Sequence, residues 1–180
     1  MNTNHKTRLA TVWLSGCSGC HMSFLDQDEQ LIDLATQITL VYSPLIDIKE
    51  FPENVAITLI EGTVANTEQE TLLYKVRSHT TLLVSLGDCA VTGNVTALRN
   101  AWTHSDQAVL NCAYTDPANL NPQIPTQVPK LLTRARPLHE LVKVDHYIPG
   151  CPPNANLIHY VLTELIAGRK PVMEEKSTYG

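Results

Sequence analysis

Cysteine offers the most chemistry in this sequence, because four of its five copies stand beside glycines. Cys17 and Cys20 form a Cys-x-x-Cys pair, whereas Cys89 and Cys151 occur singly, much further along the chain. Glycine lets backbone N–H groups approach a sulfur atom closely, which favours a metal or cluster site. Half of the eight glycines lie within two residues of these cysteines: Gly16, Gly19, Gly87 and Gly150.

Three kinds of site use cysteines in this way. A four-cysteine zinc site usually has two Cys-x-x-Cys pairs, and this chain has one. A thioredoxin-like redox pair would use Cys17 and Cys20 but would leave Cys89 and Cys151 without a role. An iron–sulfur cluster uses all four thiolates and tolerates irregular spacing, so the pattern favours it over the other two. Cys112 has no glycine neighbour, and we expect it to be a small buried hydrophobic residue.

Polar residues near these cysteines have structural as well as chemical interpretations. Glu61 and Asp88 each follow a β-rich run, where we expect them to bond loop backbone rather than relay protons. His21 would be a surface contact or a hydrogen-bond partner of the site. Ser18 and the backbone around it are candidate donors to sulfur. His159 is expected to be a packed helix residue, since nothing near it in sequence pairs with it.

Short β-rich runs alternate with stretches of helical periodicity. We predict strands at Leu9–Ser15, Ile38–Tyr42, Val55–Ile60, Thr81–Leu86 and Val144–Ile148. We predict helices at Met22–Gln37, Thr67–His79, Val95–Trp102 and Asn156–Ala167. The second of these opens on a capping box of Thr67 and Glu70. Five of the eleven prolines fall between residues 117 and 137, which predicts a long loop over 106–140. Residues 171–180 are predicted to be a tail.

Apolar strands separated by helices indicate a parallel sheet covered on both faces. We therefore predict an α/β fold, a flavodoxin-like doubly wound parallel sheet of four or five strands, with residues 1–180 as a single domain. Ligands of such sheets bind at the carboxyl ends of the strands. All four glycine-flanked cysteines fall just past a predicted strand end. The fold would thus bring them together at one edge.

Composition excludes several classes of protein. A hydrophobic content of 43% with 17% charged residues is typical of a folded chain, not a disordered one. A net charge of −5 gives no basic surface for nucleic acid. No apolar run approaches the roughly 20 residues of a membrane helix. The first residues lack the features of an export signal, so we expect a cytoplasmic protein with no membrane contact.

Four ordered blocks resemble the signature blocks of the small subunit of NiFe hydrogenases, over a stretch from about Thr11 to Arg169. The blocks are Gly16-Cys17-Ser18-Gly19-Cys20, Glu61-Gly62-Thr63-Val64, Gly87-Asp88-Cys89-Ala90 and Ile148-Pro149-Gly150-Cys151-Pro152-Pro153. A single Cys-x-x-Cys would be a weak signal, whereas the ordered set is specific.

This resemblance implies that one 4Fe–4S cluster, the one nearest the nickel–iron centre, is bound by Cys17, Cys20, Cys89 and Cys151. The family holds nickel and iron in a separate large subunit, so no catalytic metal ligand is expected in this chain. Electrons would pass between that large subunit and a diaphorase module that reduces NAD and carries iron–sulfur clusters and FMN. Some members are thought to hold FMN in the small subunit too, but no residue here specifically indicates one.

The chain most resembles the short small subunits of cytoplasmic, bidirectional, NAD-reducing hydrogenases. Membrane-bound and periplasmic small subunits carry a twin-arginine leader and a cysteine-containing C-terminal extension, which this sequence lacks. The cluster-bearing subunit of respiratory complex I shares the fold and the Gly-Cys-Pro-Pro block, but its first cysteines are adjacent. We therefore expect an electron-transfer subunit of an H2:NAD+ oxidoreductase. The alternatives are a complex I-like subunit and a zinc-binding flavodoxin-like interaction module.

Two segments are candidates for contacts with partner proteins. Leu25 fits the core-facing stripe of its predicted helix, while Met22 and Phe24 are candidates to face the large subunit. A basic stretch in this acidic chain is either a solvated face or a docking site for an acidic partner, and the solvated face is favoured. The stretch contains Lys130, Arg134, Arg136 and Lys143.

Overall fold

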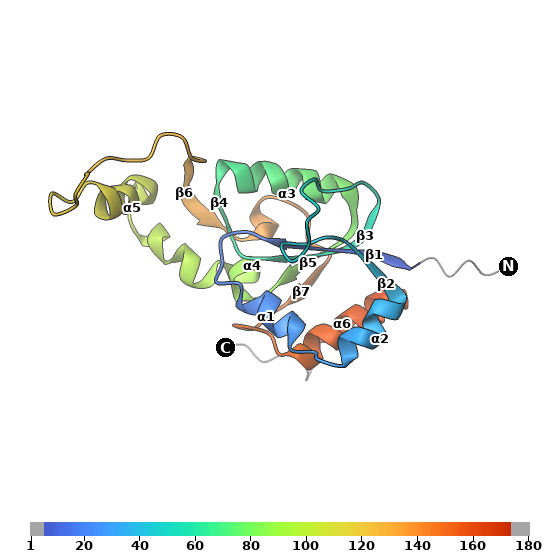
Figure 1. Ribbon diagram of the computed structural model, residues 1–180. Coiled ribbons are helices and arrows are strands. Elements are labelled where there is room, and N and C mark those ends of the chain that lie inside the picture. The colour runs from blue at the N-terminus through green and yellow to red at the C-terminus, as the bar shows by residue number, and fades with distance from the viewer. Residues whose placement is uncertain (1–5, 174–180) are drawn as a thin grey trace.

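The computed structural model describes residues 6–173, and five parallel strands form its central sheet (Figure 1). The strands are β1 (Thr7–Trp13), β2 (Ile38–Tyr42), β3 (Val55–Glu61), β5 (Thr80–Leu86) and β7 (His146–Ile148). Their order is β2-β1-β3-β5-β7, and every neighbouring pair is parallel. The order reverses between β1 and β3, as in flavodoxin-like sheets, so the predicted fold class is confirmed.

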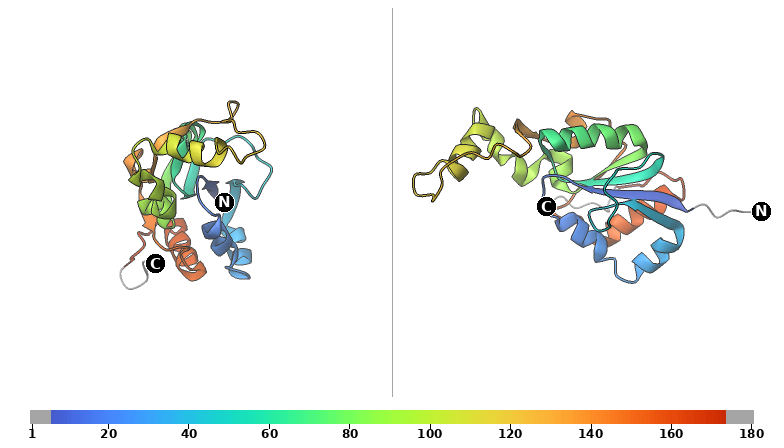
Figure 2. Two further views of the ribbon diagram at one scale, coloured as in Figure 1. Left: turned by 90° about the vertical axis from the view of Figure 1, so that its left-hand side faces the viewer. Right: turned by 45° about the horizontal axis from the view of Figure 1, so that its top comes forward.

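Helices cover both faces of this sheet (Figures 1 and 2). On one face lie α1 (Gly19–Leu25), α2 (Gln30–Gln37) and α6 (Ala155–Ile166), and on the other lies α3 (Thr67–His79). Successive strand residues point to opposite faces, so Leu9 packs with Ile158 of α6, while Ala10 packs with Leu73 of α3. Both faces of the strands are thus buried, which accounts for their continuous apolar sequence.

The first predicted helix, Met22–Gln37, is wrong as a single element. The chain forms α1 and α2 with a break at residues 26–29, where Asp28 adopts a left-handed φ of 50°. Aspartate tolerates this conformation better than most residues because its short side chain bonds locally. A run of polar residues at the break leaves no apolar side chain to hold one continuous helix against the sheet.

The cap of α3 also differs from its prediction. Asn66, not Thr67, is the N-cap, and its side-chain oxygen accepts a hydrogen bond from the N–H of Gln69 at 2.9 Å. Asn66 ends β4 (Val64–Asn66), a short strand that the sequence pattern did not indicate. The extended backbone at Asn66 places its side chain over the first turn.

The predicted long loop over 106–140 is wrong in about half of its length. The segment contains most of α5 (Ser105–Tyr114), all of β6 (Leu131–Arg136) and the 3-10 helix η2 (Leu138–Glu140). The prolines lie outside these elements, after Tyr114 and on either side of β6. Tertiary bonds hold β6: it pairs antiparallel with β4, and Arg99 donates to the carbonyl of Leu132 at 2.8 Å. Residues 115–130 form no helix or strand.

Two further elements complete the fold. Residues of the predicted helix Val95–Trp102 form a 3-10 helix, η1 (Asn94–Ala101), which follows the short helix α4 (Asp88–Thr92). From η1 onward, α5 and the segment after it project away from the sheet (Figures 1 and 2). Of the predicted tail, residues 171–173 are irregular and the remainder lies outside the described residues.

Candidate functional site

Four cysteines from three separate loops line one cavity at the carboxyl edge of the sheet. The cavity has a volume of about 70 Å³, and its lining includes Cys17, Cys20, Cys89 and Cys151. Each loop follows a strand of the sheet: β1, β5 and β7. The predicted meeting of these side chains at one edge is therefore observed, while their role as ligands stays a prediction.

The four thiols differ in exposure. Cys20 is buried, Cys89 is partly buried, and Cys17 and Cys151 are exposed. Burial raises the pKa of the Cys20 thiol, and the charge of Glu61 and the other cysteines raises it further. Burial also raises the pKa of Cys89, with Cys151 and Cys17 adding to the effect. Both shifts favour the neutral thiol, and binding of a metal centre by these thiols would release their protons.

Space and backbone donors around the sulfur atoms depend on glycine. A Cβ atom at Gly87 would lie 2.2 Å from the Cys20 Sγ, and Gly87 has a φ of 79°. The N–H of Gly19 donates to the Cys17 Sγ at 3.4 Å, which bears out the expected backbone donor to sulfur. Ser18 adopts a φ of 66° before α1, and its side chain makes no capping hydrogen bond.

Glu61 and His21 form a buried pair beside this cavity, which the sequence pattern did not indicate. The Glu61 Oε2 accepts from the His21 backbone N–H at 3.0 Å and lies 2.5 Å from the His21 Nδ1. Both residues are at most 4% exposed, so His21 is not a surface contact. Glu61 lines the cavity and ends β3, in register with Trp13 at the end of β1. The predicted ends of these two neighbouring strands could have indicated that Glu61 and His21 lie close together.

Asp88 bonds loop backbone, as predicted. Its Oδ1 accepts a hydrogen bond from the N–H of Gly150 at 2.7 Å, and its own N–H donates to the Gly150 carbonyl at 2.9 Å. His159 is only part-buried on α6 and its Nδ1 lies 3.0 Å from the Gln27 Oε1, a partner that sequence proximity could not reveal.

The structure differs from the predicted exposure of Cys112, Phe24 and Leu25. It agrees with the prediction for Met22. Cys112 is exposed rather than buried, because it lies on the projecting α5. Phe24 is 6% exposed and packs in the core, while Leu25 is 36% exposed, which reverses their predicted places. Met22 is 55% exposed, as a partner contact requires. Within the basic stretch, Arg136 pairs with Glu140 and Lys143 pairs with Asp145.

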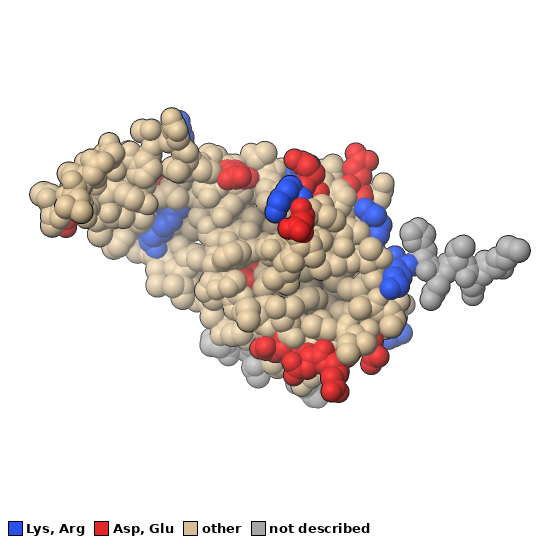
Figure 3. Space-filling model, viewed as in Figure 1, with Lys and Arg blue, Asp and Glu red and all other residues tan. Residues whose placement is uncertain are grey.

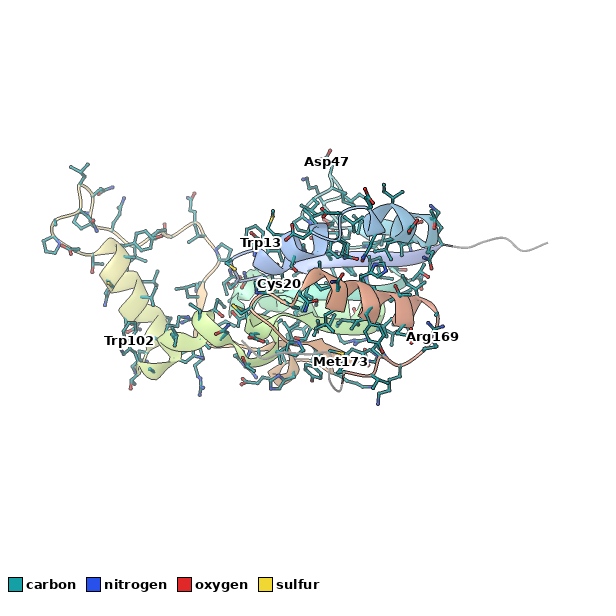
Figure 4. The ribbon with its side chains drawn as sticks, turned by 90° about the horizontal axis from the view of Figure 1, so that it is seen from below. Trp13, Cys20, Asp47, Trp102, Arg169 and Met173 are labelled. Atoms are coloured by element: carbon teal, nitrogen blue, oxygen red, sulfur yellow. The ribbon has the colours of Figure 1, made fainter. Side chains whose placement is uncertain are left out.

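Trp13 marks the outer rim of the site. Its side chain is 48% exposed, and its Nε1 donates to the Gly16 carbonyl at 3.2 Å, within the turn that leads to Cys17. Figure 4 shows Trp13 and Cys20 near one another, away from the projecting segment that carries Trp102. A large apolar ring thus stands at the surface beside the exposed thiols.

Neither a single-ion site nor a helix able to span a membrane occurs among residues 6–173. No three His, Cys, Asp or Glu side chains in that range are grouped so that they could hold one metal ion. The zinc alternative therefore gains nothing from the geometry. Likewise, none of the helices in this part of the chain is long and apolar enough to cross a membrane.

Comparison with known proteins identifies relatives along nearly the whole chain. A family model described as NADH ubiquinone oxidoreductase, 20 kDa subunit, matches residues 17–165. The NAD-reducing hydrogenase HoxS subunit delta of Cupriavidus necator is 41% identical over 172 residues, which cover 93% of this chain and 82% of the relative. The iron–sulfur subunit of an F420-non-reducing hydrogenase of Archaeoglobus profundus is 30% identical over 185 residues. That match covers 91% of this chain but only 57% of the relative.

A solved structure has nearly the same fold throughout. One chain of a crystal structure of an NAD+-reducing NiFe-hydrogenase in its H2-reduced state superposes with a TM-score of 0.92 and 40% sequence identity. The match covers 97% of this chain and 99% of that one.

Proposed function

The chain belongs to the family of the 20 kDa subunit of NADH ubiquinone oxidoreductase, and we propose that it is the electron-transfer small subunit of an NAD-reducing NiFe hydrogenase. The observation that carries this proposal is the meeting of Cys17, Cys20, Cys89 and Cys151 around one cavity. The hydrogenase relatives support this proposal, because they are similar to the chain over almost its full length.

The proposed cofactor is one 4Fe–4S cluster with these four cysteines as its only protein ligands. When bound, such a cluster accepts and donates one electron at a time. The donor set fits it, because four thiols surround the cavity and the Gly19 N–H already points to sulfur. Gly87 leaves room for Cys20, and Glu61 and His21 fix the buried side of the site. Among residues 6–173, none specifically indicates a second cofactor such as FMN.

The proposed partners follow from the exposure of the site. Cys17 and Cys151 lie at the surface, so a cluster held there would be covered by another subunit. We assign that place to a large subunit carrying the nickel–iron centre, with an iron–sulfur and flavin diaphorase as the route to NAD. The complex would be cytoplasmic, and the chain one cluster-bearing domain. A complex I-like role is disfavoured by the two residues that separate Cys17 from Cys20.

Substitution of each cysteine in turn tests the ligand set. Serine at position 17, 20, 89 or 151 is expected to lower the iron content and to remove the broad visible absorbance that bleaches on reduction. Cys112→Ser is the matched control, because Cys112 lies on α5, and it should keep both properties. If Cys89→Ser and Cys151→Ser retained full iron content, the four-cysteine cluster would be wrong.

Purification from the native host tests the assembly. The chain is expected to co-purify with a nickel-containing subunit and with a flavoprotein that reduces NAD in the presence of H2. Recovery of the loaded chain as a monomer, with no nickel in any fraction that contains it, would contradict the proposed role.

A further inference from the structure

We infer that Asp88 is a positioning residue that locks together two of the three loops that carry the cysteines and holds the reduction potential of their cluster low. The inference rests on the proposed function, since it concerns the cluster assigned to these cysteines. It adds a residue that is not a ligand, on the first turn of α4, and gives it two separable effects.

The first effect comes from a reciprocal pair of hydrogen bonds between two loops. Asp88 and Gly150 directly precede Cys89 and Cys151. The Asp88 Oδ1 accepts from the Gly150 N–H at 2.7 Å, and the Asp88 N–H donates to the Gly150 carbonyl at 2.9 Å. Each loop therefore fixes the other at the residue just before a cysteine.

The same clamp continues the sheet. The N–H of Gly87 donates to the carbonyl of Ile148 at 2.7 Å, one step beyond the last paired residues of β5 and β7. Position 150 has no room for a side chain, because a Cβ at Gly150 would lie 2.6 Å from the Pro153 Cα. The carboxylate of Asp88 thus supplies the side-chain bond that joins these two loops. Without it, the distance between Cys89 and Cys151 would be set by backbone bonds alone.

The second effect comes from charge. Asp88 lines the cavity together with the four cysteines. Among the described residues, the ion pairs leave Asp88 without a basic partner. An unneutralised carboxylate opposes the arrival of an electron on a nearby cluster, and net charge near a cluster is one determinant of its potential. The reduced state is therefore disfavoured by Asp88.

Two variants separate these effects in the full chain, purified anaerobically with its cluster loaded. Asp88→Asn keeps an oxygen acceptor of the same shape and removes the charge, whereas Asp88→Ala removes both. Asp47→Asn is the control, because it removes the same charge from an exposed side chain far from Cys20 (Figure 4). The readouts are iron per chain, the EPR line shape of the reduced cluster, and its midpoint potential by redox titration.

We expect Asp88→Asn to keep the wild-type iron content and line shape while its potential becomes more positive. A tenfold change in the reduction equilibrium, about 59 mV for one electron, is the minimum shift expected. Asp88→Ala should lose at least half of the iron or change the line shape, and Asp47→Asn should match wild type. Rescue of iron content by asparagine but not by alanine is the signature of positioning.

Different results would contradict the clamp, the charge effect and the proposed function. Wild-type iron content and line shape in Asp88→Ala would overturn the clamp. An unshifted potential in Asp88→Asn, or an equal shift in Asp47→Asn, would overturn the charge effect. A wild-type chain with no iron–sulfur signal would overturn the proposed function itself, before any variant is compared.

Discussion

At the scale of single residues, the site depends on a position where no side chain fits. Gly87 has a φ of 79°, and a Cβ there would lie 2.2 Å from the Cys20 Sγ. Gly168, at the end of α6, has a similar φ of 71°, but a Cβ atom at Gly168 would have nothing within 4 Å. The two glycines therefore share a positive φ, but Gly87 also has a ψ of 161°, a conformation almost restricted to glycine, and of the two only Gly87 has a steric conflict.

Alanine at each position separates these two demands. Gly168→Ala should lose about 1 kcal/mol of unfolding free energy because of its positive φ, and Gly87→Ala should lose more, because its backbone conformation is almost restricted to glycine. Gly87→Ala should in addition displace Cys20 and lower the iron content, while Gly168→Ala keeps it. Urea unfolding and iron analysis measure the two quantities. A Gly87→Ala chain that carried wild-type iron would show that Cys20 tolerates displacement and is not held by this contact.

At the scale of elements, α3 owes its start to a strand residue. Asn66 belongs to β4, and its side chain caps the N–H of Gln69 at 2.9 Å. The sequence offered Thr67 and Glu70 as the capping pair, but Thr67 is exposed and already inside the helix. The element boundary thus depends on the pairing of β4 with β6, a contact between distant segments.

Alanine substitutions distinguish the two caps. Asn66→Ala should lower the free energy of unfolding by about 1 kcal/mol, because an N–H of the first turn loses its acceptor. Thr67→Ala should change it by less than about 0.5 kcal/mol, as expected for an exposed side chain. Equal effects in a chemical denaturation series would restore the capping box as the true start.

A partly buried ion pair joins α3 to the turn before β7 and gives a test in acid. The Asp145 Oδ2 accepts from the Arg77 Nη1 at 2.7 Å and from the Leu83 N–H at 2.9 Å. Burial alone would raise the pKa of Asp145, but these bonds outweigh it and hold the pKa below its ordinary value. The pair therefore contributes stability above the ordinary aspartate pKa, and this contribution disappears as the pH falls through the lowered one.

Asp145→Asn should therefore lose about 1 kcal/mol of unfolding free energy at neutral pH. The difference from wild type should shrink as the pH falls below about 4, where the wild-type carboxylate becomes protonated. Urea unfolding at neutral and acid pH measures both values. A difference independent of pH would mean that the charge of Asp145 has no role at this edge.

Local sequence pattern was sufficient to predict the elements that have continuous apolar runs or helical periodicity. The five sheet strands, α3 and α6 have continuous apolar runs or helical periodicity, and strand ends sufficed to place the four cysteines at one edge. Three features depend on distant contacts and were missed: the β4–β6 pair, the helix α5, and the Glu61–His21 pair. The strand β6 was predicted to be part of a loop because prolines lie on either side of it and its partner strand β4 was not predicted.

At the scale of the whole molecule, the cysteine edge has the character of an interface. Trp13 and Met22 are 48% and 55% exposed beside the thiols. In Figure 3, Asp and Glu gather along the edge near α2, while the projecting segment is almost free of charged side chains. Exposed aromatic and methionine side chains are typical of protein interfaces. We therefore expect the large subunit to cover this edge.

A charge on this edge should weaken assembly. Met22→Asp is expected to reduce affinity for the large subunit at least tenfold, since it would bury a carboxylate in an apolar contact. Ile32→Asp, on α2 and 70% exposed, introduces the same charge away from the cysteines and should leave affinity unchanged. Quantitative co-purification of each variant measures the difference. Equal retention of both would place the interface elsewhere.

We propose that four cysteines of this chain hold one electron-transferring cluster. Mössbauer spectroscopy of the anaerobically purified full chain, with metal analysis of the same sample, tests it most directly. We expect about four irons per chain in a single 4Fe–4S cluster that takes up one electron on reduction. A folded, colourless chain with one zinc and no iron would contradict it.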